Sequence, residues 1–241
     1  SSTVLNTHPG YEIDYEGFEV RSYRSNWLMN ELLINNDPRR RYFFYRQNDC
    51  TPGGLGINGE ICEVMPERLF CSEDSQPAHY TDDMAFCWVN EGYWGRDHGF
   101  SGGIPPDTLL RTAIGVYPAA GAFDDNDFLY ATDNPGGEGA GITPIILASW
   151  VDFMQAEMAL VNNNTGIAEN FMQAGMLKSV DKVMSFVSLD PDADTSFVPT
   201  GTDVSNFFNL ISNEYNDTGS INNKWNVFAK QVLVSHYGNG I

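Results

Sequence analysis

The second half of the chain repeats apolar residues at the spacing of one face of an α-helix. Two such segments flank the polar residues 162–165, and this arrangement predicts a helical hairpin. A second pair follows the loop at 188–202. We expect Thr165 to cap the second helix and Gly238 to end the fourth. The apolar stripes, which we expect to form a buried core over residues 141–241, are Ile146, Trp150, Phe153 and Leu160; Ile167, Phe171, Leu177, Val180 and Val183; Val204, Phe207, Phe208, Ile211 and Tyr215; and Ile221, Trp225, Phe228 and Val232.

Residues 1–140 lack such a period and predict loops with short strands and one short helix. That helix covers residues 25–35 and should stop at Asp37-Pro38, because a residue before proline avoids helical angles. We expect it to pack on a part of the protein outside this sequence. The glycine-rich run at 93–128 is irregular, so it orders only through specific contacts, and loops of this kind usually carry function. The predicted fold is mainly α with irregular loops and short strands.

Charge limits the classes of partner. The chain has 32 acidic and 13 basic residues among 241, a formal net charge of −19. Such a surface repels nucleic acid and anionic lipid and suits a neutral or cationic ligand. The longest apolar run, residues 142–161, is interrupted by Ser149, Asp152, Gln155 and Glu157, so it does not predict a membrane-spanning helix.

Four cysteines, Cys50, Cys62, Cys71 and Cys87, fall within a short loop-rich region. An even number in a cluster favours disulfides in an exported protein, and four cysteines allow three pairings. We favour sequential pairing, Cys50 with Cys62 and Cys71 with Cys87. The alternative is a zinc site that uses His79, but no C-x-x-C spacing supports it.

Two charged runs have a structural and a binding interpretation. Arg39, Arg40 and Arg41 are adjacent, and we favour a solvated or salt-bridged turn with carboxylates of the same chain over an anion site. Asp124, Asp125 and Asp127 have the oxygen-rich spacing of a calcium site. They lack the glycine and the distant glutamate of an EF-hand, so we favour an exposed acidic turn.

The sequence contains no recognised catalytic motif. The patterns G-x-S-x-G and H-E-x-x-H are absent, and the four histidines are scattered. Carboxylate pairs suited to glycoside cleavage are expected by chance in so acidic a chain, and the sequence singles out none. We therefore expect a protein that is not an enzyme and needs no cofactor or metal, and we keep a secreted polysaccharide hydrolase as the alternative.

Aromatic residues of the irregular half suggest a binding site. The rings of Tyr80, Trp88, Tyr93 and Trp94 could stack on the apolar face of a sugar. The side chains that follow Trp94, namely Arg96, Asp97 and His98, could bond its hydroxyl groups. In the alternative interpretation, Arg96 and Asp97 pin the loop by pairing with each other or with backbone, and His98 is a core residue.

Several segments together resemble a known family. GRDHG at 95–99, IPPD at 104–107, RT at 111–112 and GVYPAAGAFD at 115–124 resemble, in order and spacing, the signature of the SusD/RagB nutrient-binding outer-membrane lipoproteins, specifically SusD-like family 2. Four further segments, at 36–47, 142–160, 174–186 and 230–241, agree with it, so the resemblance covers nearly the whole chain. Family members are about twice as long. The resemblance therefore implies that residues 1–241 are the C-terminal half of a single SusD-like domain.

The resemblance also implies a fold and a role. In this family tetratricopeptide-like α-helical hairpins support a loop-rich ligand face. The implied protein is anchored to the extracellular face of the outer membrane by a lipid outside this sequence. It captures an oligosaccharide or a peptide and delivers it to a SusC-like TonB-dependent transporter. A scaffold subunit that binds no ligand is a further alternative. Because the GRDH residues recur among members with different ligands, the loop-pinning role is favoured for Arg96, Asp97 and His98.

Overall fold

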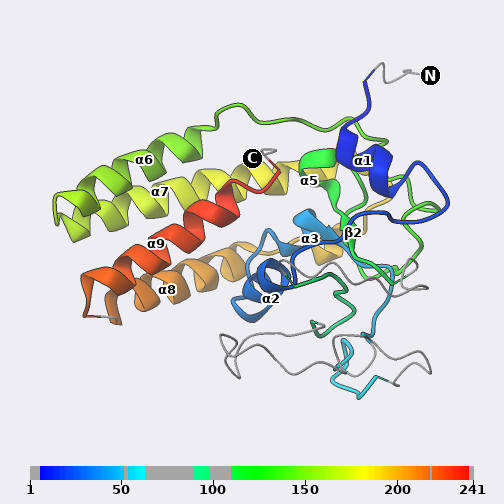
Figure 1. Ribbon diagram of the computed structural model, residues 1–241, viewed down its shortest axis with the longest axis horizontal. Helices are drawn as coiled ribbons and strands as arrows, with labels where there is room; N and C mark the ends of the chain where they lie inside the picture. The colour runs from blue at the N-terminus through cyan, green and yellow to red at the C-terminus, as the bar shows by residue number, and fades with distance from the viewer. Residues whose placement is uncertain (1–5, 52–53, 63–88, 98–109, 218, 239–241) are drawn as a thin grey trace.

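A computed structural model describes residues 6–51, 54–62, 89–97, 110–217 and 219–238. These residues are mainly helical with irregular loops and short strands, which confirms the predicted fold class at that level. Figure 1 shows four long helices, α6 to α9, gathered on one side of the molecule, and the short helices α1, α3 and α5 on the other. None of the helices in the described part of the chain combines the length and apolarity needed to cross a bilayer.

Helices α6 (Ala148–Val161) and α7 (Thr165–Met184) form the first predicted hairpin. Asn164 precedes the first residue of α7, so Thr165 lies one position inside the expected cap. The helices approach closely at Gly175 of α7, where an added Cβ would lie 3.0 Å from the carbonyl oxygen of Ser149. Only part of the α6 arc is buried. Trp150, Phe153 and Leu160 face the core, whereas Ile146, Val151, Met154 and Met158 are exposed.

Helices α8 (Gly201–Asp217) and α9 (Ile221–Ser235) form the second hairpin, as expected from the same periodicity. Thr200 and Asp203 cap α8, because the Asp203 carboxylate accepts hydrogen bonds from the N–H and hydroxyl of Thr200 at 2.8 and 2.7 Å. Part of the predicted core is confirmed, with Phe153, Phe207, Ile211, Tyr215 and Phe228 in one buried cluster. The expectation is wrong for Ile167, Leu177 and Ile221, which are exposed. Helix α9 ends at Ser235, and Gly238 lies in the following turn with a φ of 84°.

Helices α1 (Pro9–Asp14), α2 (Asn26–Ile34), α3 (Arg40–Phe43) and α5 (Val116–Ala119) belong to the irregular half. The expectation that the short helix at 25–35 packs on a part outside this sequence is wrong for its inner face. Met29 and Leu32 of α2 are buried against residues of this chain, in a cluster that includes Tyr42, Phe43 and Tyr117. An aromatic core therefore orders this half despite its lack of period.

A sheet of two short strands, each of two residues, joins two segments of the irregular half that are far apart in sequence. Strand β1 (Phe44–Tyr45) pairs antiparallel with β2 (Ala113–Ile114), with Phe44 opposite Ile114. Gly115 follows β2, and a Cβ there would lie 2.3 Å from the carbonyl oxygen of Tyr42, so only glycine allows this approach. The pairing brings residues 115–124 alongside the arginines that flank β1.

The Cys50–Cys62 disulfide is present, which confirms the first of the two expected pairs. It closes a loop of irregular backbone beyond β1, with the two Cα atoms 5.7 Å apart. Cys71 and Cys87, together with His79 of the alternative zinc site, lie outside the described residues.

Candidate functional site

The three consecutive arginines at the start of α3 find carboxylate partners in their own chain, as expected: Arg39 with Asp37, Arg40 with Glu91 and Arg41 with Asp124. They differ in burial and in how well their donors are satisfied. Arg39 is fully buried rather than solvated. Its guanidinium donates to both oxygens of Asp37 at 2.9 and 2.6 Å, and it reaches Ser179 of α7 and Gln231 of α9 at 3.0 and 3.3 Å. Arg39 therefore joins the irregular half to both helical hairpins.

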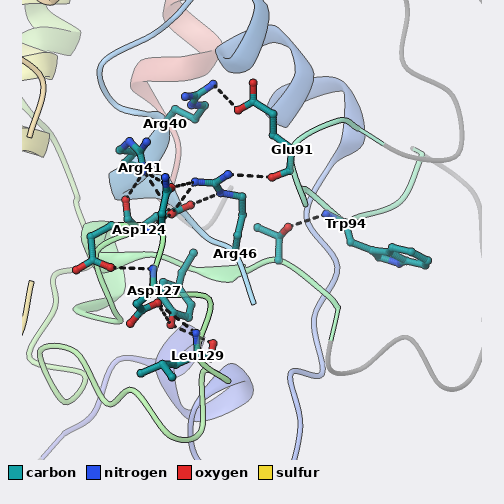
Figure 2. Close-up of polar contacts among 12 residues, drawn as sticks. Arg40, Arg41, Arg46, Glu91, Trp94, Asp124, Asp127 and Leu129 are labelled. Carbon is teal, nitrogen blue, oxygen red and sulfur yellow. Dashed lines mark hydrogen bonds and ion pairs between the residues drawn. The ribbon is translucent and has the colours of Figure 1, made fainter. Parts of the chain in front are cut away.

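Arg46 and Asp124 form a second buried pair, shown in Figure 2. Arg46 donates to the two carboxylate oxygens of Asp124 at 2.6 and 2.9 Å and to the carbonyl oxygen of Glu91 at 2.9 Å. Burial disfavours the charged guanidinium, but the neighbouring Asp124 outweighs it and raises the pKa of Arg46. Arg41 adds hydrogen bonds to the Asp124 carbonyl oxygen and the Asn126 amide oxygen, at 2.7 and 2.8 Å. The irregular segments are thus fixed by charge-assisted hydrogen bonds.

The acidic run is only partly the exposed turn we expected, because Asp127 is exposed and Asp125 is half-buried, but Asp124 is buried. Asp124 is buried beneath Arg46, and Asp127 accepts a hydrogen bond from the Tyr45 hydroxyl at 2.7 Å. Asp125 accepts from the backbone N–H of Asp194 at 2.7 Å, which joins the run to the loop before α8. Among the residues that the structure describes, no group of three His, Cys, Asp or Glu side chains could hold a metal ion. These carboxylates organise the loop instead.

Tyr93 and Trp94 lie in the core, contrary to the expected stacking surface. The Tyr93 ring has no exposed area; it packs edge-on against Phe44, and the guanidinium of Arg46 lies 4.9 Å from its centre. Trp94 is only 6% exposed, and its backbone N–H donates to the Thr112 hydroxyl at 2.8 Å. A ring must present a face to solvent to stack on a sugar, so both residues are better explained as packing groups.

Arg96 and Asp97 contact the start of α2. The backbone N–H of Arg96 donates to the Arg24 carbonyl oxygen at 2.9 Å, and its guanidinium lies over the Tyr23 ring at 3.7 Å. The Asn26 amide donates to the Asp97 carboxylate at 3.4 Å. These contacts agree with the loop-pinning interpretation. The remaining candidates, Tyr80, Trp88 and His98, lie outside the described residues.

Arg40 differs from its two neighbours. Its nearest carboxylate oxygen among the described residues belongs to Glu91 at 3.8 Å, which is beyond hydrogen-bond distance. Its guanidinium also lies 5.8 Å from the centre of the Tyr93 ring. Figure 2 shows the Arg40 side chain directed away from the Arg46–Asp124 pair. Arg40 therefore has guanidinium N–H groups that can donate further hydrogen bonds, whereas Arg39 and Arg41 already donate to groups of their own chain.

Arg40 lines an open cavity of about 400 Å³ that we call the α2–α8 pocket. This volume is in the range of small-molecule sites. Its walls come from the turn after α2, the start of α3, the loop before α8 and the first turns of α8. The lining side chains that matter here are Asn36, Arg40 and Arg41, Phe197 and Pro199, and Asp203, Asn206 and Leu210.

A second cavity of about 570 Å³ lies between α6 and α9. Its walls are mainly apolar and include Trp150, Met154, Trp225 and Leu233. Among the described residues that line it, Glu157 and His236 are the ionisable ones. A specific small-molecule site needs several polar groups that converge on the ligand to fix its orientation. The α2–α8 pocket meets that requirement better.

Sequence reasoning did not find the α2–α8 pocket. Asn36 and Arg40 were visible beside the proline of Asp37-Pro38, and Asn206 was visible on a predicted helix. No local pattern indicates that these distant segments meet. Comparisons of the chain with protein-family models, with curated proteins and with solved structures return no match.

Proposed function

We propose that this chain is the C-terminal part of a SusD/RagB-type nutrient-binding lipoprotein. In this proposal the protein sits on the extracellular face of the outer membrane, held by a lipid anchor outside this sequence. It captures an oligosaccharide or a peptide and passes it to a SusC-like TonB-dependent transporter. The ligand is held and released without chemical change.

One observation carries the proposal: segments that resemble the family signature are joined by buried arginines. Arg39 and Arg46 both belong to residues 36–47. Arg46 binds Asp124 at the end of residues 115–124, and Arg39 binds Ser179 within residues 174–186. A chance likeness in separate segments would not lead us to expect such specific contacts between them.

The helical half supports the same proposal at a finer level. Hairpins α6–α7 and α8–α9 would correspond to tetratricopeptide-like units of the scaffold, and the irregular half would supply the ligand face. The carboxylates nearest the α2–α8 pocket suit binding better than catalysis. Asp37 and Asp124 are paired with arginines, and Asp203 caps α8. Asp37 and Asp124 are thereby held in ion pairs, whereas Asp203 is exposed at the pocket wall.

The test combines binding with product analysis. Protein isolated with its membrane anchor is titrated with neutral glycans, acidic glycans and peptides by calorimetry, and each ligand is then recovered and analysed by mass spectrometry. We expect at least one class to bind and to be recovered intact. Cleavage of a glycan, abolished by a single carboxylate-to-amide substitution, would instead establish a hydrolase. If none of the ligand classes bound to the protein, the scaffold alternative would be favoured.

A further inference from the structure

We infer that the α2–α8 pocket binds a neutral oligosaccharide through Arg40, Asn36 and Asn206. This inference rests on the proposed function, and it names both the ligand class and the side chains that recognise it. Three features of the pocket carry it: the balance of its charges, its polar side chains that can form further hydrogen bonds, and its apolar wall.

The charges around the pocket are balanced. Asp37 is paired with Arg39, and Arg41 lies 3.5 Å from Asp124. The Asp203 carboxylate already accepts two hydrogen bonds from Thr200. The pocket lining therefore holds two carboxylates, Asp37 and Asp203, against two guanidinium groups, Arg40 and Arg41, so neither sign of charge predominates. The net charge of −19 opposes the approach of an anion, so an uncharged ligand fits best.

The polar groups suit hydroxyls. Asn36 and Asn206 are exposed, and within the described residues neither side-chain amide makes a hydrogen bond. Each amide offers donors and an acceptor, which matches a hydroxyl that both donates and accepts. Arg40 adds guanidinium donors, because its ion pair with Glu91 is long at 3.8 Å. Three side chains, from the turn after α2, from α3 and from α8, thus offer hydrogen bonds to one cavity.

The apolar wall suits the C–H face of a sugar. Phe197, Pro199 and Leu210 line the pocket together with the polar groups. The Arg41 guanidinium lies 5.0 Å from the centre of the Phe197 ring, and Arg41 is itself held by Asp124. The ring is therefore braced by the buried network. An amphipathic ligand with one apolar face and several hydroxyls matches this combination.

The decisive experiment compares two asparagines of the same helix. The anchored protein is titrated calorimetrically with neutral hexasaccharides of glucose, mannose, galactose or xylose, with a hexagalacturonate, and with neutral and basic hexapeptides. Asn206→Ala removes a pocket amide, whereas Asn209→Ala removes an exposed amide of α8 that does not line the pocket. For the neutral hexasaccharide that binds, we expect Asn206→Ala to weaken affinity about three- to tenfold and Asn209→Ala to leave it unchanged.

Two further measurements sharpen the test. Arg40→Ala should weaken the same hexasaccharide by about tenfold or more, since it removes a charged donor. The wild-type affinity should be nearly the same at low and high sodium chloride, because a neutral ligand forms no ion pair for salt to screen. Thermal unfolding of each variant should match wild type, which separates a lost contact from a lost fold.

Each outcome decides a different point. Equal affinities for Asn206→Ala, Asn209→Ala and wild type would overturn the pocket assignment, while the nutrient-binding proposal would stand. Tighter binding of the hexagalacturonate or of a peptide would overturn the ligand class in the same way. Failure of every ligand to bind would overturn both the inference and the proposed nutrient-binding function.

Discussion

Replacing Asp124 by alanine should destabilise the fold severely. The side chains of Asp124 and Arg46 are each 1% exposed, and two hydrogen bonds at 2.6 and 2.9 Å join them. Removing one partner leaves the other charge buried without compensation, which costs about 3–5 kcal/mol. Because a domain is typically stable by only about 5–15 kcal/mol, Asp124→Ala should lose a large part of the total.

Equilibrium unfolding in urea measures this loss as a lower midpoint at an unchanged slope. Glu214→Ala is the matched control, because Glu214 and Lys230 form a partly exposed pair at 3.7 Å that should contribute no more than about 1 kcal/mol. A loss below about 1 kcal/mol for Asp124→Ala would refute the reasoning that this pair holds the irregular half together.

A double variant keeps the test valid if Asp124→Ala fails to fold. Asp124→Leu combined with Arg46→Met replaces both charges by apolar groups, and such replacements of buried pairs are often neutral or stabilising. We expect the double variant to be more stable than Asp124→Ala, which would demonstrate coupling between the two sites. If Arg46→Met added a further, independent loss to that of Asp124, the two side chains would not act as a pair.

Three other predictions concern separate parts of the fold. Replacing Cys50 and Cys62 by serine should cost about 3 kcal/mol in urea unfolding, because their disulfide closes a loop with a sequence separation of 12; an unchanged midpoint would contradict this. Gly175→Ala should destabilise the protein, since its Cβ would lie 3.0 Å from a backbone oxygen of α6. Gly166→Ala in the same helix meets no atom within 4 Å and should stabilise the protein by about 0.5–1 kcal/mol. Changes in stability of equal sign for the two variants would refute the close packing of α6 and α7. His8 caps α1 by accepting a hydrogen bond from the Gly10 N–H at 3.0 Å, and burial lowers the pKa of His8. The contribution of His8 to folding stability is therefore complete above the unfolded-state pKa of 6.5 and is lost as the pH falls through the lower folded-state pKa. The variant His8→Asn keeps a capping group that does not titrate, so its urea midpoint should fall less than that of wild type between pH 7 and pH 5. Equal falls in the two midpoints would contradict a lowered pKa of His8 in the folded protein.

The helical half was predictable because its signal is local. Apolar residues repeat within each of α6 to α9, so the sequence indicated both hairpins and the burial of Phe153, Phe207, Tyr215 and Phe228. The same periodicity overstated burial in the first hairpin. It placed Ile146 and Leu177 in the core, but both side chains are exposed.

The irregular half was less predictable because long-range contacts determine it. Arg39 finds Ser179 and Gln231 at sequence separations of 140 and 192, and no local pattern announces such partners. The same limitation affected Tyr93 and Trp94. Aromatic residues in a glycine-rich loop resemble a binding surface, yet Arg46 and Phe44 enclose the Tyr93 ring once β1 pairs with β2. The pocket at Asn36, Arg40 and Asn206 was hidden for the same reason.

Isolation of the anchored protein from its membrane in mild detergent tests the nutrient-uptake role most directly. The proposal predicts that it co-purifies in a fixed ratio with a large β-barrel of the TonB-dependent transporter type, and that an oligosaccharide or peptide added to the complex is retained intact. Recovery of the protein alone, together with cleavage of the added ligand, would contradict it.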